Sequence, residues 1–182
     1  LQTGQHVLIV GASGGVGTYA VQLAKALGAE VTGVASAAKA ELVYSLGADH
    51  VIDYRTNYLE DSKRDYDLIV DIGGRNSVSS LRSVLRQQGT LVFTGGEGGN
   101  RVTGGIGRQL GAVLMSPFLK QNLKMFVSGE NHSMMVRLNE FIQSGAIKPS
   151  IGKRFTLDEV PAAMRWLVAG NAEGKTLIVI KP

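Results

Sequence analysis

The chain has 182 residues, of which 44% are hydrophobic and 19% charged, as is typical of one globular domain with a sizeable core. It contains no cysteine, which excludes disulfides and thiolate metal ligands and fits a reducing compartment, so we expect a cytoplasmic protein. The net charge of +4 indicates a mildly basic surface, but no basic stripe with stacking aromatic residues predicts nucleic acid as a partner. No apolar run approaches the length of a membrane span.

Apolar runs and helical patterns alternate along the first half of the chain. The runs predict strands at His6–Val10, Val31–Ala35, 50–54, Leu68–Ile72 and Thr90–Thr94, with helices at Val16–Leu27, Ala38–Leu46 and Val78–Leu85. Short strands separated by helices indicate right-handed β-α-β crossovers, and near-continuous apolar strands are typical of strands buried on both faces. The pattern therefore predicts an α/β fold with a parallel sheet.

The second half is less regular. Residues 95–111 are so rich in glycine that we predict a long loop there. An apolar helical segment broken at Pro117 follows; its apolar residues are Leu114, Met115, Phe118, Leu119 and Leu123. Further elements are predicted at Lys124–Ser128 (a sixth strand), Ser133–Ser144 (an amphipathic helix), Pro161–Val168 (a helix) and Thr176–Ile180 (a last strand).

A glycine cluster, "VGASGGVG", separates the first predicted strand from the first helix. Gly14 and Gly17 occupy the second and third glycine positions of G-x-G-x-x-G, with Ala12 in the first; read one residue earlier, Gly11 begins G-x-x-G-x-x-G. A turn that binds a dinucleotide must be tight and must bring its backbone close to the pyrophosphate, which excludes long side chains. Helix N–H groups then point at the phosphates. The strand–glycine–helix–strand order predicts a dinucleotide site rather than a turn without a ligand, and no Gly-Lys-Ser/Thr follows as a Walker loop requires.

The end of the second predicted strand bears on the choice of dinucleotide. An NAD site usually carries Asp or Glu about 20 residues beyond the first glycine, but no acid occurs from Val31 to Ala40. Ser36 and Lys39 lie there instead, and a hydroxyl with an ammonium suits a 2′-phosphate. We therefore predict NADPH as the cofactor. The alternative is that Ser36 caps the next helix and Lys39 is a solvated side chain.

Several stretches resemble the cofactor-binding domain of the medium-chain dehydrogenase/reductase superfamily, in its zinc-free quinone-oxidoreductase-like branch. They are "GASGGVGTYAVQLAKALGAEVTGVAS", "LGADHVIDYR", "YDLIVDIGG" and "GTLVFTGG". The later "GGIGRQLGAVLMSPFLKQNLKMFVS" is similar to the subgroup that contains the reticulon-4-interacting oxidoreductase. The resemblance covers nearly the whole chain in order. It implies a doubly wound Rossmann fold with a six-stranded parallel sheet and no metal site.

The resemblance also implies roles for residues at matching positions. Gly15 and Val16 would offer backbone N–H groups to the pyrophosphate, and Tyr54 would join Ser36 and Lys39 around the 2′-phosphate. The other implied contacts are Gly73 beside the adenosine, Thr94, Gly95 and Gly96 near the nicotinamide ribose, and Phe126 and Val127 at the carboxamide. Some relatives add an arginine at the 2′-phosphate, where this chain has Gly170.

The same resemblance implies two parts: an NADP-binding Rossmann domain over residues 1–150, and a segment, 151–182, that returns toward a GroES-like catalytic domain and completes it. The chain starts with "LQTGQH", as a cut through a longer protein would. The substrate pocket and proton donor would lie in the missing domain, so we name no catalytic residue and expect the isolated chain to be inactive. We expect structural or exposed roles for His6, His50 and His132, and turn and strand-end roles for Asp67 and Asp71.

The predicted function is the NADPH-binding part of an oxidoreductase that transfers hydride to a small quinone, enone or related carbonyl acceptor. The resemblance further implies a homodimer through the edge strand near Met125–Ser128. One alternative is a non-catalytic binding or structural protein, such as a crystallin, that keeps the fold. A short-chain dehydrogenase would also fit Gly11, Gly15 and Gly17, but no tyrosine here has the lysine four residues on that this class needs.

Overall fold

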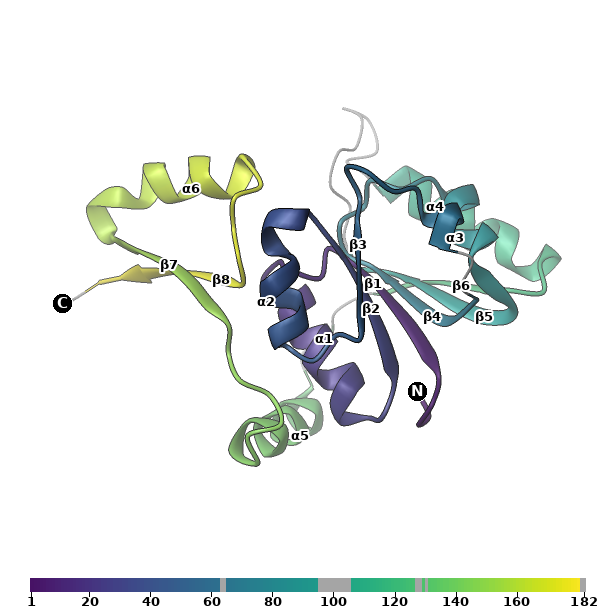
Figure 1. The fold of residues 1–182 in the computed structure, drawn as a ribbon, viewed down its shortest axis with the longest axis horizontal. Helices are drawn as coiled ribbons and strands as arrows, with labels where there is room; N and C mark the ends of the chain where they lie inside the picture. Colours follow the sequence, from purple (N-terminus) through teal and green to yellow (C-terminus); the bar gives the residue numbers. More distant parts are fainter. Residues whose placement is uncertain (63–64, 95–105, 127–128, 130, 181–182) are drawn as a thin grey trace.

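The fold is organised around one parallel sheet. The computed structural model describes residues 1–62, 65–94, 106–126, 129 and 131–180. Six strands lie in the order β3-β2-β1-β4-β5-β6 (Figure 1). Their bounds are β1 His6–Val10, β2 Glu30–Ala35, β3 His50–Asp53, β4 Tyr66–Asp71, β5 Leu85–Phe93 and β6 Asn122–Met125. This is the strand order of the doubly wound dinucleotide-binding fold, with its switch point between β1 and β4, and it confirms the predicted fold class.

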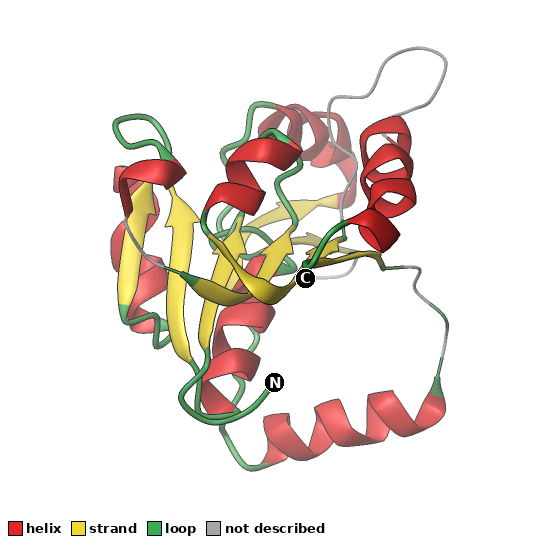
Figure 2. Ribbon diagram, turned by 90° about the vertical axis from the view of Figure 1, so that its right-hand side faces the viewer, coloured by secondary structure: helices red, strands yellow, loops and turns green. Residues whose placement is uncertain are grey.

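Helices cover both faces of the sheet (Figure 2). The helices that follow the first five strands are α1 Gly17–Ala26, α2 Ala40–Ser45, α3 Val78–Ser83 and α4 Ile106–Met115, with short 3₁₀ turns η1 Ala37–Lys39, η2 Leu59–Ser62 and η3 Ser116–Phe118. Val21 of α1 and Val43 of α2 belong to one core cluster, whereas Leu81 of α3 and Ala112 of α4 belong to the other. No helix in the described part of the chain is long and apolar enough to cross a bilayer.

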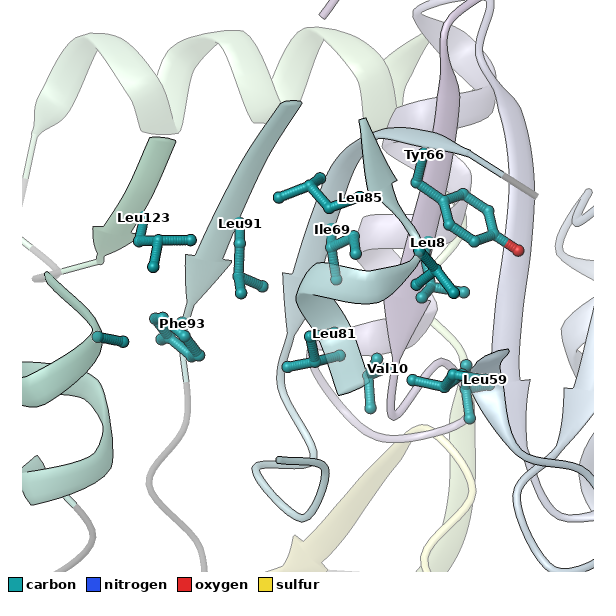
Figure 3. Close-up of a cluster of buried hydrophobic side chains, with 13 residues drawn as sticks. Leu8, Val10, Leu59, Tyr66, Ile69, Leu81, Leu85, Leu91, Phe93 and Leu123 are labelled. Atoms are coloured by element: carbon teal, nitrogen blue, oxygen red, sulfur yellow. The ribbon is translucent and has the colours of Figure 1, made fainter. Parts of the chain in front are cut away.

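The two cores follow from the alternation of side chains along each strand. Val7 and Ile9 of β1 point into the core under α1 and α2. Leu8 and Val10 point the opposite way, into the core under α3 and α4 (Figure 3). Every second residue is buried on each face, which explains why the strand reads as one continuous apolar run. Further members of the second core shown in Figure 3 are Ile69, Leu81, Leu91, Phe93 and Leu123.

The predicted loop over 95–111 is wrong from Ile106 onward, because α4 begins there. A glycine inside a helix costs about 1 kcal/mol relative to alanine, so Gly107 and Gly111 argued against a helix. Gln109 and Ala112 are buried, and Ala112 joins the core beneath α4. Burial of one helix face thus offsets the poor propensity. Residues 95–105 lie outside the described residues.

Two strand boundaries also differ from the prediction. β5 begins at Leu85 rather than Thr90, because Leu85 already pairs with Tyr66 of β4 before a register shift brings Thr90 opposite Leu68. β6 begins at Asn122 rather than Lys124 and ends at Met125. An irregular start of this kind carries no period-two pattern, so it is invisible in the sequence.

The C-terminal part forms its own small sheet. After α5 His132–Gln143, the side chain of Gln22 in α1 exchanges two hydrogen bonds with the backbone of Lys148, at 3.0 and 2.8 Å. The chain continues through β7 Ile151–Thr156, η4 Leu157–Glu159, α6 Val160–Val168 and β8 Lys175–Val179, and β7 pairs with β8 in parallel (Figure 1). The domain boundary at residue 150 remains a prediction.

Candidate functional site

The residues with predicted cofactor roles gather at the carboxyl edge of the sheet. Because the six strands are parallel, the segments that follow them emerge at one edge. The glycine turn follows β1, and the later strands are followed in turn by Ser36, Tyr54, Gly73, Thr94 and Phe126. The structure therefore brings these positions to one side of the molecule. Gly95, Gly96 and Val127 lie outside the described residues.

The glycine turn is tight and is held by the neighbouring strand. Gly11 leaves β1 with φ of 86°, a left-handed conformation that favours glycine. The N–H groups of Gly11 and Ala12 donate to the carbonyl of Val34 in β2, at 3.2 and 3.1 Å. Gly14 then donates to the Gly11 carbonyl at 3.1 Å, which closes the turn.

Helix α1 begins in close contact with this turn. A Cβ on Gly17 would lie 2.1 Å from the Gly11 carbonyl oxygen and 2.7 Å from the Ala12 Cα, so only glycine fits. Ala12, which replaces the usual first glycine, is accommodated because it faces Gly33 of β2, where an added Cβ would lie 2.9 Å from the Ala12 methyl. Gly33 on β2 thus provides the space that Ala12, in place of the first glycine of the motif, requires.

Two backbone N–H groups at the start of α1 remain available. Among the described residues, the amides of Val16 and Gly17 donate to no protein acceptor, and no side chain caps the helix. The Gly15 amide faces the Gly174 carbonyl instead, because Gly14 and Gly174 form a parallel bridge. Free N–H groups at a helix start, together with the helix dipole, attract anions. The arrangement can therefore hold a phosphate group.

The end of β2 carries the hydroxyl and the ammonium that the sequence analysis singled out. Ser36 is buried, and its side chain makes no capping hydrogen bond to η1. The Lys39 ammonium is half-buried and donates to the carbonyls of Gly170 and Ala172, at 2.8 and 2.7 Å. The alternative interpretation, a capping serine and a solvated lysine, is therefore wrong. Since an ammonium has three donors, one N–H of Lys39 remains for a ligand.

Tyr54 stands next to this pair. Its N–H donates to the Ala35 carbonyl at 3.3 Å, and its side chain is half exposed. The guanidinium of Arg55 lies over the Tyr54 ring, 5.8 Å from the ring centroid. Arg55 was not singled out in the sequence, because an arginine in a polar stretch reads as an ordinary surface residue.

Asp71 orders the loops that follow β4 and β5. Its carboxylate is fully buried and accepts a hydrogen bond from the Gly74 N–H at 3.1 Å. Its carbonyl accepts the Thr94 N–H at 3.0 Å, and the neighbouring Gly73 N–H donates to the Val10 carbonyl at 3.2 Å. These bonds give Asp71 the strand-end role that the sequence analysis expected. Phe126, beyond β6, is held by its N–H on the Phe93 carbonyl at 2.9 Å.

The C-terminal segment contributes a residue that the sequence analysis missed. The Gly174 N–H donates to the Ser13 carbonyl at 2.8 Å, so β8 starts directly at the glycine turn. There the Lys175 side chain passes Gly15, where an added Cβ would lie 3.4 Å from the ammonium nitrogen, and the ammonium lies 5.7 Å from the Tyr19 ring centroid. No local signal marks Lys175, because β8 brings it to the turn from the far end of the chain.

The opposite, amino edge of the sheet holds charged residues with structural partners. Glu30 contacts His6 and His50, with N–O distances of 3.3 and 3.1 Å, and His132 is exposed at the start of α5. Asp67 accepts the His6 N–H at 2.8 Å and pairs with Arg86. Burial raises the pKa of Asp67, but these two donors lower it more, so the net pKa lies below the usual value. A polar hollow beside Gln5 and Asp67 lies at this edge, away from the glycine turn.

The described residues do not form a recognisable metal centre. Within the described ranges, no three His, Asp or Glu side chains gather so that they could hold an ion. The carboxyl edge instead offers backbone amides, hydroxyls and the cationic groups of Lys39, Arg55 and Lys175. Its chemistry is that of an anion-binding edge.

Comparisons with known proteins agree with this arrangement. A family described as zinc-binding dehydrogenase matches residues 46–178. The mitochondrial NAD(P)H oxidoreductase RTN4IP1 of Bos taurus is 36% identical, over 97% of this chain and 48% of that protein. The chloroplastic NADPH-dependent alkenal/one oxidoreductase of Arabidopsis thaliana is 31% identical, over 96% of this chain and 40% of that protein.

A solved structure confirms the fold independently of the sequence. The quinone oxidoreductase of Coxiella burnetii superimposes with a TM-score of 0.84 at 22% identity, over 99% of this chain and 54% of that one. The chain therefore spans about half the length of the relatives it matches. Two relatives carry organelle names, mitochondrial and chloroplastic, so the expected cytoplasmic location is not confirmed.

Proposed function

Because the chain belongs to the zinc-binding dehydrogenase family of the medium-chain dehydrogenase/reductases, we propose that it is the NADPH-binding domain of an oxidoreductase. The observation that carries the proposal is the glycine turn at the switch point of the sheet. A ligand of an open parallel sheet binds at this point, outside the carboxyl ends of the strands. The turn offers the two free amides of Val16 and Gly17, and a Cβ at Gly17 would fill its cradle.

The pyrophosphate of the cofactor would lie on these amides. Val16 and Gly17 would donate to its oxygens, with the backbone of Gly15 beside them, and the helix dipole would favour its negative charge. Lys175 would add an ammonium from the C-terminal side, where it passes Gly15. Gly73 would border the adenosine, because its N–H keeps the loop after β4 against the end of β1.

The 2′-phosphate of NADPH would lie among Ser36, Lys39 and Tyr54. No carboxylate stands at the end of β2 to bind the free ribose hydroxyls of NADH or to repel a phosphate. The carbonyls of Gly170 and Ala172 hold the Lys39 ammonium in place. This fixes a cation beside Ser36 before the ligand arrives, which reduces the entropy lost on binding.

When bound, the nicotinamide supplies the hydride, while the chain binds and orients it. Thr94 and Phe126 would face the nicotinamide end, because they follow β5 and β6. We propose a quinone, an enone or a related carbonyl compound as the hydride acceptor. The names of the relatives, a quinone oxidoreductase and an alkenal/one oxidoreductase, support this class.

Cofactor titration of a charge-reversed variant tests the proposal. Dissociation constants for NADPH and NADH are measured by calorimetry for the wild type and for Lys39→Glu. The variant should bind NADPH at least about tenfold more weakly and NADH almost unchanged, because the carboxylate repels the 2′-phosphate. Lys120→Glu, which reverses an exposed charge just before β6, should bind both cofactors normally. NADPH affinity that is unchanged in Lys39→Glu would contradict the assignment.

We also propose a homodimer through β6. This strand is the last of the sheet and pairs only with β5 among the described strands. Met125 on β6 and Phe126 just beyond it are partly exposed. An open apolar edge favours pairing with a second copy. A monomer mass in light scattering at high protein concentration would argue against the dimer.

A further inference from the structure

We propose that Arg55, two residues beyond the end of β3, is the second cation for the 2′-phosphate and helps to select NADPH over NADH. The inference rests on the proposed function and extends it to a residue that neither the motif nor the resemblance assigns. It follows from the position of Arg55, from the absence of a carboxylate partner for its side chain among the described residues, and from the single charge that Lys39 supplies.

The placement follows from strand pairing. β3 lies beside β2, with Asp53 opposite Ala35, so the residues after the two strands leave the sheet side by side. The Tyr54 N–H extends this pairing by one bond to the Ala35 carbonyl. Ser36 directly follows β2, whereas Tyr54 directly follows β3 and Arg55 comes one residue later. Arg55 thus leaves the same edge as Ser36, one strand further from β1.

The side chain of Arg55 is available for a ligand. It is exposed, and it pairs with no carboxylate among the described residues, whereas Arg86 pairs with Asp67. Its guanidinium lies over the Tyr54 ring, 5.8 Å from the centroid, and its backbone N–H donates to Asp53 Oδ1 at 3.0 Å. The ring and the turn thus orient the guanidinium without occupying its N–H donors.

The charge of a 2′-phosphate exceeds what Lys39 alone can balance. A phosphate monoester carries close to two negative charges at neutral pH. Lys39 supplies one positive charge and has one free N–H, because two carbonyls take the others. Asp53, at the end of β3, opposes the phosphate. A guanidinium can donate two parallel N–H bonds to phosphate oxygens, which a lysine cannot do. Arg55 would therefore offset both the second phosphate charge and Asp53.

Replacement of Arg55 tests the assignment on the cofactor half that carries the phosphate. Calorimetry with NADPH, NADH, 2′,5′-ADP and 5′-AMP is compared for wild type, Arg55→Ala and Arg55→Lys. We expect Arg55→Ala to weaken the binding of NADPH and 2′,5′-ADP about tenfold and to change the affinity for NADH and 5′-AMP by no more than about twofold. The salt dependence of NADPH binding should also decrease. Arg55→Lys should recover part of the loss. Arg137→Ala, on the exposed surface of α5, is the matched control for net charge.

The outcomes separate this inference from the proposed function. If the wild type prefers NADPH and Arg55→Ala keeps the full preference, the role of Arg55 is refuted while the proposed function stands. An equal loss for NADPH and NADH also refutes it, because it points to damage of the loop. If the folded wild type binds neither cofactor, both proposals fail together.

Discussion

At the scale of single residues, the candidate site depends on the missing side chain of Gly17. Its Cα sits so close to the turn that a methyl group would overlap the Gly11 carbonyl. The need for glycine at position 17 was predictable, because the spacing of glycines after an apolar strand indicates a tight turn with a closely packed helix. The partners of Lys39 were not predictable. Its acceptors, Gly170 and Ala172, lie more than 130 residues away in the sequence.

We predict that Gly17→Ala destabilises the chain, because Gly17 packs directly against the glycine turn. The added methyl must push α1 away from the turn, which should lower the free energy of unfolding by about 2–4 kcal/mol. Gly111→Ala, within α4, is the matched control, because nothing lies within 4 Å of the added Cβ. Its stability should stay equal or rise by up to about 1 kcal/mol. Urea unfolding measures both, and equal stabilities of the two variants would contradict the packing described for Gly17.

At the scale of elements, the buried strands were the most predictable part, and the segments that depend on distant packing were the least. β1, β2 and β4 carry mainly apolar residues along their middle because both of their faces are covered. The first part of helix α4, 106–111, was missed because its sequence is glycine-rich and burial of Ala112 decides its structure. The position of Lys175 could not be found because β8 reaches the turn through a bridge between residues distant in the sequence, Gly14 and Gly174.

Asp67 ties three strands together at the amino edge, which gives stability a defined pH dependence. Its carboxylate joins the start of β4 to His6 of β1 and to Arg86 of β5. Its pKa is lowered in the folded chain, so its contribution is complete above the unfolded-state value of 3.8 and is lost as pH falls through the folded-state pKa.

Asp67→Asn should therefore lower the free energy of unfolding by about 1–3 kcal/mol at pH 7. The difference from the wild type should shrink as the pH falls below about 4, because protonation then removes the same charge. Asp65→Asn, at an exposed position nearby, should change stability by less than about 0.5 kcal/mol. Chemical unfolding across the pH range gives the values, and a difference that stays constant down to pH 2 would exclude this role.

At the scale of the whole molecule, the account combines a parallel sheet, a glycine turn at its switch point and a C-terminal segment that returns to that turn. The parallel sheet follows from local patterns together with the right-handed crossover rule, whereas its doubly wound arrangement was implied by the family resemblance. The return of β7, α6 and β8 carries no local signature, since it is fixed by long-range bonds such as those between Gln22 and Lys148. The turn and this segment together form the edge that would receive the cofactor.

The most direct test of the central claim is residue-resolved NMR of the amide signals of the folded chain during titration with NADPH. The account predicts saturable shifts at Gly14, Gly15, Val16 and Gly17, with further shifts at Ser36 and Tyr54 that NADH reproduces only in part. Shifts confined to the amino edge around Gln5 and Asp67, or no shifts at all, would contradict it.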